Sequence, residues 1–547
     1  MKQIKDPLYG YIVVEDKYID LVDSAEFQRL RNIRQTGYEA LYPSALHNRF
    51  VHSLGVFHLG KKAITSFRSN INNKIEKLSD WEVWEETFIL ACLLHDVGHS
   101  PFSHTGEEFY NQSTNFIQLF NEIIDNPEFT KDIDHDYGKP HEAMSACVGY
   151  NLIKKCHLTS HIDKELFVRA IIGVKYTTTN DNTLILNTII EMLNGSVIDV
   201  DKLDYLIRDT YVTGYKSIAI DIDRLLSGYT LSEYISEDNN KKSVAVYKKS
   251  ALSVVESVAY ANDLERRWIQ SNPTVLYDCK LIEIAIKRYS AYMTDTYPML
   301  KKYVNVFNIH SISKEGYPDE EEIKLKLLSD DDIIEYLKNH DNSLISTQYF
   351  SRSDRYKPLW KSEPEFSEVV KKELSARILR ELKSLLRQQT SSNPYIHQEE
   401  LFFINESLYK QRLHPLQDLK KSESSGTARY VALENNLKIF QVLRNFSNLN
   451  SYSFEFAIIF GNHFESNYKK LAVNNIFVEV SAGKVIELGK TLTVNAISST
   501  EEEQQGLFYI YTSRKNILQA QNQKKNFTQQ VIRYIQEHWD DQIVCEE

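Results

Sequence analysis

The sequence lacks several features that mark specialised classes of protein, and each absence narrows the possibilities. Its five cysteines are odd in number, widely scattered and free of CxxC pairs, so they predict neither a disulfide framework nor a zinc ribbon. The amino-terminal segment has no apolar signal core, and no apolar run approaches the length of a membrane span. We therefore expect a protein of the reducing cytoplasm that does not enter a membrane.

Excess basic charge is also missing. The chain has 64 Lys and Arg against 75 Asp and Glu, which gives a formal net charge of −11 at pH 7. Proteins that bind nucleic acid or a membrane surface usually have a basic binding surface, so we do not expect nucleic acid as a partner. The hydrophobic share of 42% and the charged share of 25% are those of an ordinary globular protein, and 547 residues are too many for one compact core.

What the sequence does contain is helical periodicity over its first two thirds. Apolar residues recur every three or four positions over 82–99, 141–156 and 183–196, and further helices are predicted over 250–295 and 330–339. The pattern predicts a large α-helical domain over about 390 residues.

The remainder of the chain has a different character. Short runs rich in β-branched and aromatic residues predict strands, and an amphipathic helix follows near the end. The runs cover 453–460, 474–480, 490–497 and 506–513, and the helix covers 526–539. The fold class is therefore mainly α, with a helical domain over residues 1–390 and a smaller α+β domain of unassigned role over residues 391–547.

Titratable side chains crowd the ends of several apolar helical patterns. The most crowded stretch is LLHDVGHSPFSH at 93–104, and the others are HNRFVHSLGV at 47–56, KPHEAMS at 139–145 and VIDVDKLDYLIRD at 197–209. A charged group in such a position is costly unless it is paired or bound to a metal. A single one is ordinarily a hydrogen-bonded core residue, whereas four in series favour a metal site.

A mixed set of imidazoles and carboxylates can be assembled from these stretches. It comprises His52, His95, Asp96 and Asp201. Such ligands suit a divalent metal ion, namely Mn, Mg, Fe, Ni or Zn. The adjacent His95 and Asp96 can bind one ion together only if ligands from another element face them. His52 and Asp201 would be those ligands. The set leaves coordination positions open for water and substrate, as a hydrolytic metal requires.

The ordered motifs resemble those of a known family. The H…HD…D pattern is that of HD-domain phosphohydrolases, and the flanking blocks are similar to those of the deoxynucleoside triphosphate (dNTP) triphosphohydrolases and their bacterial relatives. The blocks are SAEFQRLRNIRQ, HNRFVHSLGV, HDVGHSPFSH and IDVDKLDY, and they occur in the family's order. The resemblance covers residues 6–209 and, more weakly, the chain to about 360. It implies an all-helical HD core that releases deoxynucleoside and inorganic triphosphate from dNTPs.

The resemblance also implies roles for individual residues. His52, His95, Asp96 and Asp201 would be the metal ligands. Arg49, three residues before His52 and so on the same helical face, would bind the substrate phosphates. The remaining contacts with phosphate and sugar would come from Gln35, Lys202, Tyr205 and Asp209. Outside this context, a surface ion pair would be the favoured interpretation of Arg49, and Tyr205 could be a core residue.

Three further histidines would lie near the α-phosphate, namely His99, His104 and His141. His104 is the candidate general acid for the leaving 5′-oxygen, because an imidazole titrates near working pH. A pair of carboxylates, Glu107 and Glu142, would orient it. Aspartate is more usual in the family at the position of Glu107, and the longer side chain changes the reach. His141 could instead cap a helix that begins after Pro140.

An N-terminal segment carries residues that resemble a regulatory site. In the nucleotide-activated members this segment binds a guanine nucleotide at a subunit interface, and the matching residues are Lys2, Asp23, Gln28 and Arg31. An acid and an amide suit the edge of guanine, while Arg and Lys suit phosphates. The resemblance thus implies a GTP or dNTP activator and a homo-oligomer, a dimer or tetramer. The same segment also forms a helix under the active site in members without activation.

Two other functions stay open at this point. The first is an HD-type phosphodiesterase or nucleotidase that acts on another nucleotide, against which the context of Gln35, Arg49 and Asp209 argues. The second is a nucleotide-sensing HD module that signals through residues 391–547, against which the complete set of metal ligands argues.

Overall fold

The computed structural model divides into two compact units. The first comprises Met1–Arg266, Ala285–His340 and Glu465–Glu502, and the second comprises Arg267–Ile284, Asp341–Phe464 and Glu503–Glu547. The predicted boundary at residue 390 immediately precedes a stretch outside the described residues, and it stays a prediction. The structure describes residues 1–71, 79–110, 114–134, 137–178, 180–235, 241–303, 305–318, 320, 322–390, 403–421, 428–461, 476–481, 484–490 and 507–541.

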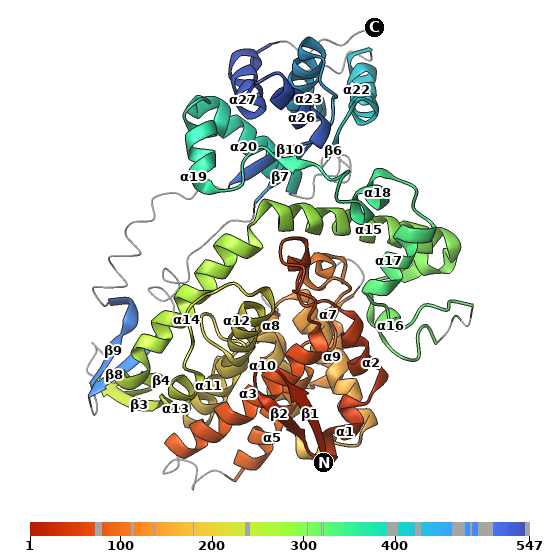
Figure 1. Ribbon diagram of the computed structural model, residues 1–547. Helices are drawn as coiled ribbons and strands as arrows, with labels where there is room; N and C mark the ends of the chain where they lie inside the picture. The colour runs from red at the N-terminus through yellow and green to blue at the C-terminus, as the bar shows by residue number, and fades with distance from the viewer. Residues whose placement is uncertain are drawn as a thin grey trace. The chain divides into compact units, whose positions relative to one another are not determined.

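The first unit is built around two helices that pack on one another, α3 (Arg49–Asn70) and α5 (Trp81–Leu94) (Figure 1). Their close approach depends on Gly60, where a Cβ would lie 2.5 Å from Sγ of the buried Cys92. Around them pack α9 (Pro140–Lys155), α10 (Lys164–Ile172), α11 (Asp181–Leu193) and α12 (Val200–Thr213). The predicted helices over 82–99, 141–156 and 183–196 are confirmed as α5, α9 and α11, except that α5 ends at Leu94 and residues 95–99 lie beyond it.

The other helices of this unit are shorter or lie outside this core. The helix predicted over 250–295 is divided into α14 (Leu252–Glu265) and α15 (Pro273–Thr296), because Pro273 starts a new helix. The residues of α15 up to Ile284 belong to the second unit, and those from Ala285 belong to the first. Helix α17 (Asp330–Asn339) has the predicted bounds. The remaining helices are α1 (Asp16–Val22), α2 (Ala25–Arg29), α7 (Phe116–Ile123), α8 (Pro127–Ile133), α13 (Ile222–Ser227) and α16 (Ile309–Ile312).

Side-chain caps fix where two helices of the first unit begin. Asn48 accepts a hydrogen bond from the backbone N–H of Val51 at 3.2 Å and starts α3. Asp199 accepts from the backbone N–H of Lys202 at 2.6 Å and starts α12. Asn and Asp are preferred caps because their side chains satisfy free N–H groups in the first turn. Each cap therefore fixes the first turn of its helix. Each of these two turns contains one predicted metal ligand.

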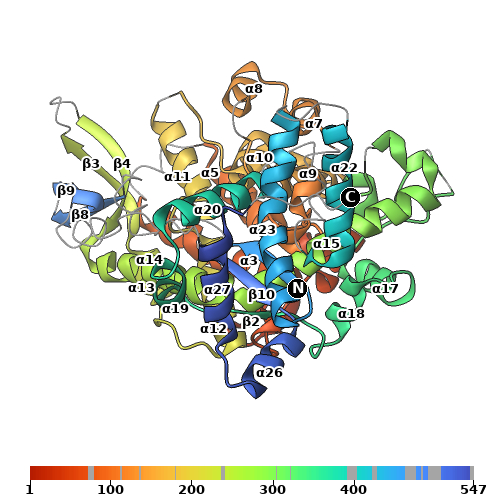
Figure 2. The ribbon, with the colours of Figure 1, turned by 90° about the horizontal axis from the view of Figure 1, so that it is seen from above.

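Two small sheets belong to the first unit. The antiparallel pair β1 (Lys2–Asp6) and β2 (Gly10–Val14) is joined by a turn that ends at Gly10, with a φ of +78°. The other sheet has the order β3 (Tyr229–Ile235), β4 (Lys241–Lys248), β8 (Phe477–Ser481) and β9 (Lys484–Glu487), and it lies beside α13 in both ribbon views (Figures 1 and 2). Strands β3 and β4 were not predicted from the sequence.

The second unit contains a four-stranded sheet with helices. Its order is β5 (Lys357–Pro358), β10 (Phe508–Thr512), β7 (Phe456–Phe460) and β6 (Phe403–Ile404), with antiparallel pairs throughout. The predicted strands over 453–460 and 506–513 are confirmed, and the strand over 490–497 lies almost wholly outside the described residues. The helices are α18 (Leu344–Phe350), α19 (Glu363–Phe366), α20 (Ala376–Thr390), α22 (Glu406–Lys421), α23 (Ala428–Asn450), α26 (Arg514–Asn522) and α27 (Phe527–His538).

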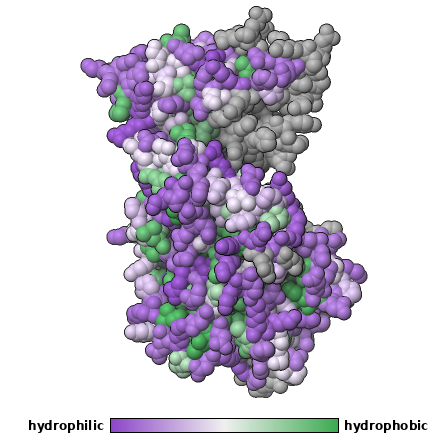
Figure 3. Space-filling model, turned by 90° about the vertical axis from the view of Figure 1, so that its right-hand side faces the viewer, coloured by the Kyte–Doolittle hydropathy of each residue, from purple (hydrophilic) through white to green (hydrophobic). Residues whose placement is uncertain are grey.

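The fold class predicted from the sequence is confirmed: the HD region is helical, and a smaller α+β region follows it. On the face seen in Figure 3, hydrophilic residues dominate and hydrophobic residues are scattered among them. None of the helices in the described part of the chain combines the length and the apolar character needed to cross a bilayer.

Candidate functional site

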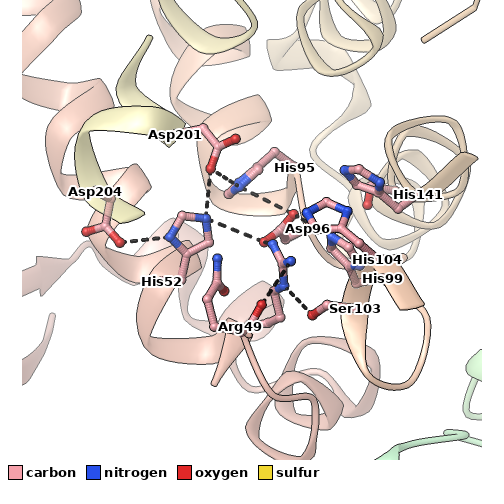
Figure 4. Close-up of polar contacts among 12 residues, drawn as sticks. Arg49, His52, His95, Asp96, His99, Ser103, His104, His141, Asp201 and Asp204 are labelled. Carbon is pink, nitrogen blue, oxygen red and sulfur yellow. Dashed lines mark hydrogen bonds and ion pairs between the residues drawn. The ribbon is translucent and has the colours of Figure 1, made fainter. Parts of the chain in front are cut away.

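The four predicted metal ligands lie together where three helices begin or end (Figure 4). His52 is in the first turn of α3, His95 and Asp96 directly follow α5, and Asp201 is in the first turn of α12. Nε2 of His52 lies 2.9 Å from Oδ1 of Asp201 and 3.6 Å from Oδ2 of Asp96. Nε2 of His95 lies 3.5 Å from Asp96 and 3.7 Å from Asp201. We call these four residues the HD quartet.

Hydrogen bonds on the far side of both imidazoles determine which nitrogen faces this site. Nδ1 of His52 bonds to Oδ2 of Asp204 at 2.8 Å, and Nδ1 of His95 bonds to the carbonyl oxygen of Cys92 at 3.0 Å. Because Nδ1 is the donor in each case, Nε2 of each ring is directed to the site. Nε2 of His95 is buried without a hydrogen-bond partner in the described structure. The residues therefore fit a divalent metal ion.

The charges around the HD quartet favour a cation. Burial by itself disfavours a charged imidazole, but hydrogen bonds to Asp201 and Asp204 raise the pKa of His52 to about 10. Burial also opposes the charge of Asp96, yet Arg49 and His95 hold the pKa of that carboxyl well below its usual range. The HD quartet therefore favours a bound cation, because its buried carboxylates are stabilised by positive charge close to them.

A network of buried charges anchors the ring of His52. Asp204 accepts hydrogen bonds from Nε and Nη2 of Arg208, at 2.8 and 2.9 Å, and from the hydroxyl of Tyr9 at 2.8 Å. Arg208 also donates to Asp6 at 2.9 Å, in the turn between β1 and β2. The network thus links His52, a predicted metal ligand, to the N-terminal strand pair.

Gly55 leaves the space that this network occupies. A Cβ at this position would lie 1.9 Å from Oδ1 of Asp204 and 2.5 Å from Nη2 of Arg208. Any larger residue in this turn of α3 would therefore displace the two charged side chains that hold His52.

Arg49 lies between the HD quartet and the loop that carries His104. Its Nη1 donates to Oδ2 of Asp96 at 2.7 Å, and its Nε donates to Oγ of Ser103 at 2.8 Å. The side chain is buried, and a third contact reaches the backbone carbonyl of Gln35 at 3.4 Å. The guanidinium is thus held beside the HD quartet, where a phosphate could approach.

The three further histidines form a second cluster beside the first. The rings of His99 and His141 stack with centroids 4.1 Å apart, and the ring of His104 lies edge-on to both, at 5.2 and 5.1 Å. Oε2 of Glu107 accepts from Nδ1 of His104 at 2.7 Å and from Nδ1 of His141 at 2.8 Å. These two hydrogen bonds hold the pKa of Glu107 below its usual range, although burial opposes this.

The backbone before His104 is strained. Phe102 and Ser103 have φ values of +55° and +54°, in the left-handed region that non-glycine residues rarely adopt. Asp330, at the start of α17, accepts from the backbone N–H of Phe102 at 2.6 Å and from that of Arg34 at 3.0 Å. Burial raises the pKa of Asp330 to about 7. The carboxyl group thus joins the loop of His104 to the loop that precedes Gln35.

The predicted sugar-side residues are buried or half-buried, with some polar atoms left unsatisfied. Oε1 of Gln35 has no hydrogen-bond partner among the described residues, while the hydroxyl of Tyr205 accepts from Asn262 at 3.1 Å. Oδ1 of Asp209 lies 2.6 Å from Nε2 of His47, and burial raises the pKa of Asp209 to about 7. Their roles toward a substrate stay predictions.

Two predicted site residues make other contacts. Nζ of Lys202 pairs with Asp199, the cap of its own helix, and donates to the carbonyl oxygen of Gly195 at 2.8 Å. Oε2 of Glu142 accepts from the backbone N–H of Lys139 at 2.8 Å, as in a capping box. A phosphate contact by Lys202 would require the first pair to open, and the orienting role of Glu142 stays a prediction.

The four residues of the predicted regulatory site form two contacting pairs. Lys2 forms an ion pair with Asp23, and Nε of Arg31 donates to Oε1 of Gln28 at 2.7 Å. The guanidinium of Arg31 also lies over the ring of Phe50, 3.6 Å from its centre. Lys2 and Asp23 are exposed, with side chains 42% and 48% accessible, so a ligand could compete for them.

Sequence reasoning missed the residues that support the site. Asp204 and Arg208 are four positions apart within DKLDYLIRD, and two opposite charges on one buried helical face were a signal that could have revealed them. Arg29 donates to the backbone carbonyls of Val97 at 3.2 Å and His99 at 2.7 Å, from within QRLR. Asp330 gave no local signal, because its partners are far away in the sequence.

Comparisons with known proteins agree with this geometry. Residues 49–205 match the HD domain family. An uncharacterized protein of Methanocaldococcus jannaschii is 30% identical over 289 residues, which are 53% of this chain and 49% of the relative. A Dictyostelium discoideum homologue of the deoxynucleoside triphosphate triphosphohydrolase SAMHD1 is 31% identical over 229 residues, 41% of this chain and 39% of the relative. The chain spans about half the length of the curated relatives it matches.

A solved structure shares the fold over nearly the whole chain. The crystal structure of a phosphohydrolase from Bacteroides thetaiotaomicron covers 94% of this chain and 100% of its own, with a TM-score of 0.53 and 18% sequence identity. At this identity the likeness shows the fold alone. The chain therefore carries an HD domain over residues 49–205, and its resemblance to the HD-domain dNTP triphosphohydrolases is confirmed.

Proposed function

We propose that this protein hydrolyses deoxynucleoside triphosphates to deoxynucleoside and inorganic triphosphate at the HD quartet. The observation that carries the proposal is the position of Arg49, whose guanidinium contacts both Asp96 of the quartet and Ser103 of the loop before His104. A phosphate held by this arginine would lie between the cation site and a proton donor. The names of the SAMHD1 relatives support the dNTP as substrate.

The residues around the phosphate would have different roles in the reaction. A divalent metal ion (Mn, Mg, Fe, Ni or Zn) would supply a Lewis acid and an activated water when bound. Arg49 positions the α-phosphate and neutralises its charge. His104 gives its proton to the leaving 5′-oxygen, and Glu107 holds the ring for that transfer. The side chain of His104 is 61% accessible, so a substrate can reach it.

The nucleoside would lie against the residues predicted for the sugar. Gln35 and Asn262 each keep a buried side-chain oxygen without a hydrogen-bond partner among the described residues, and a sugar hydroxyl could satisfy such an acceptor. Tyr205 and Asp209 would make the remaining contacts with the sugar. Lys202 would join the phosphates after leaving Asp199.

Regulation forms a second part of the proposal. A GTP or dNTP activator would bind at Lys2, Asp23, Gln28 and Arg31, and the chain would act as a dimer or tetramer whose subunits share it. In support, Arg29 follows Gln28 in the short helix α2 and donates to the carbonyl oxygen of His99 in the candidate active site. Occupancy of the regulatory site could therefore influence the geometry of the catalytic loop.

The test is identification of products from the purified full-length chain. Each dNTP is incubated with each of Mn²⁺, Mg²⁺, Fe²⁺, Ni²⁺ and Zn²⁺, with and without GTP, and the products are separated by ion-exchange chromatography. We expect deoxynucleoside and triphosphate in equal amounts. Nucleoside monophosphate would indicate a phosphodiesterase or pyrophosphatase instead, and no product under any condition would reject the proposal.

A further inference from the structure

Lys139, at the start of α9, carries an ammonium group that is only weakly paired. It is the N-cap residue of this helix and lies two positions before His141. Nζ of Lys139 lies 3.5 Å from Oε1 of Glu142, and the lysine side chain is 64% accessible. An ion pair with this exposure contributes little, because water competes for both charges. The ammonium is therefore available to a ligand.

The turn before α9 fixes the backbone of this lysine. Gly138 has a φ of +78°, and a Cβ there would lie 2.6 Å from the carbonyl oxygen of Ile172. The backbone N–H of Lys139 donates to Oε2 of Glu142 at 2.8 Å, and Pro140 begins the helix. The backbone is thus held close to His141, while the side chain stays accessible.

The acidic groups around the ammonium belong to the candidate active site. Burial by the surrounding protein disfavours the charge of Lys139, but four carboxylates outweigh it and raise the pKa of Lys139 above its ordinary value. In order of decreasing effect, they are those of Glu142, Asp201, Glu107 and Asp199. Because the attraction between charges weakens with distance, Lys139 lies near both a ligand of the HD quartet and the carboxylate that holds His104.

The HD quartet is accessible on the side of Asp201. The side chains of His52, His95 and Asp96 are buried, whereas that of Asp201 is 36% accessible. A ligand that reaches the cation site therefore passes Asp201, whose charge also acts on Lys139. The lysine is thus placed where the outer part of such a ligand would lie.

Lys202 lies next to Asp201 in the chain, but its ammonium is engaged. It pairs with the buried Asp199 and donates to the carbonyl oxygen of Gly195 at 2.8 Å. A contact between Lys202 and a ligand would leave a buried carboxylate without its partner, which is costly. Lys139 would give up only an exposed pair, so it can bind an anion at a smaller cost.

We propose that Lys139 binds the β- and γ-phosphates of the substrate, and of the inorganic triphosphate that remains after hydrolysis. The identity of the substrate rests on the proposed function. Arg49 would hold the α-phosphate, because it contacts both Asp96 and Ser103. The terminal phosphates would then extend to the accessible side of the quartet, where a lysine supplies a positive charge and N–H donors on a flexible stem. A monophosphate would not reach Lys139, so this residue favours triphosphates over monophosphates.

The first experiment measures binding apart from hydrolysis. The full-length chain in excess Mn²⁺ is titrated by calorimetry with inorganic triphosphate and with deoxyadenosine monophosphate (dAMP). Lys139→Gln should bind triphosphate about 10- to 100-fold more weakly, the usual cost of a lost hydrogen bond between charged groups, and should bind dAMP as the wild type does. Lys139→Arg keeps the charge and should recover most of the affinity for triphosphate. In the hydrolysis assay, Lys139→Gln should raise KM for each dNTP and leave kcat close to the wild-type value, because the contact forms in the ground state and persists.

Matched measurements separate this role from a structural one. Lys131→Gln removes an exposed lysine of α8 and should bind triphosphate as the wild type does. The metal content and the unfolding temperature of Lys139→Gln should equal those of the wild type, since the ion pair of this lysine is exposed. The role of Lys139 would be overturned by wild-type affinity in Lys139→Gln, by an equal loss of affinity for dAMP, or by a wild type that binds no triphosphate. Weaker triphosphate binding by Lys139→Gln in a chain that hydrolyses no dNTP would reject only the proposed function.

Discussion

The two histidine clusters on either side of Asp96 differ in how the fold supports them. The HD quartet comes from the ends of α3, α5 and α12, and behind His52 stands the buried network of Asp204 and Arg208. The second cluster depends on one carboxylate, Glu107. Its most accessible member, His104, follows two residues in left-handed conformation.

This difference fits the two tasks that we propose. An ion site benefits from ligands that are held in place before the ion arrives, because ordering them afterwards costs free energy. A proton donor must meet the substrate and then exchange its proton with water. A loop residue with 61% accessibility is suited to that task, whereas a buried helix residue is not. Rigid helix ends would thus hold the cation, and a strained loop would deliver the proton.

The largest effect of a substitution is expected at the HD quartet. Asp201→Ala removes a carboxylate ligand, and we expect kcat/KM for dNTP hydrolysis to fall by about 10³-fold or more, because a catalytic ion contributes several kcal/mol. Triphosphate release and metal content by mass spectrometry are the two measurements. Asp223→Ala is the matched control, since its side chain is 79% accessible. Unchanged metal content and activity in Asp201→Ala would contradict the assignment.

Substitution of His104 separates proton transfer from ion binding. His104→Ala should lower kcat by about 10²- to 10⁴-fold, the usual contribution of a general acid. The affinity of the HD quartet for its ion should stay at the wild-type value, because no quartet ligand is touched. Rapid-quench measurement of one turnover, together with metal content, checks both points. A loss of the quartet's ion together with the activity would show that the two clusters act as one.

A substitution in the buried network behind His52 tests whether metal affinity depends on holding that ring in place. Asp204→Asn keeps the shape of the side chain but weakens its hold on Nδ1 of His52. We expect metal affinity to fall by about 10- to 100-fold, the usual effect of losing a partner behind a ligand. Competition with a metal-binding dye measures this affinity. Wild-type affinity in a folded Asp204→Asn protein would mean that the helix alone orients the ring.

The smallest effect is expected at the loop of the second cluster. Asp330→Asn replaces the carboxylate that accepts from Phe102 and Arg34, and about 1.5 kcal/mol of hydrogen bonding would be lost. Kcat should fall about tenfold while metal affinity and KM stay unchanged. Asp331→Asn, at the exposed neighbouring position of the same helix, is the control. An equal loss in both variants would show that only the helix start is affected.

Much of the site could be predicted because its signals are local. The apolar periodicity of 82–99 predicted α5, and the HD dipeptide at its end predicted two ligands that the structure places beside His52 and Asp201. The pairing of Glu107 with His104 spans three residues and was also accessible to sequence reasoning. The β3–β4 strand pair was missed although its two strands pair with each other locally, whereas the pairing of β4 with β8, more than 200 residues later, has no local signal.

By itself the sequence determined the helices, the order of the motifs and the identity of the candidate ligands, since each depends on neighbours within a few turns of helix. Only the tertiary structure decided which buried charges meet. Tyr9 reaches Asp204 across 195 residues, and Asp330 reaches Phe102 across 228. Such contacts leave no periodic trace in the chain, because the partner that satisfies a buried polar group is set by packing and not by spacing.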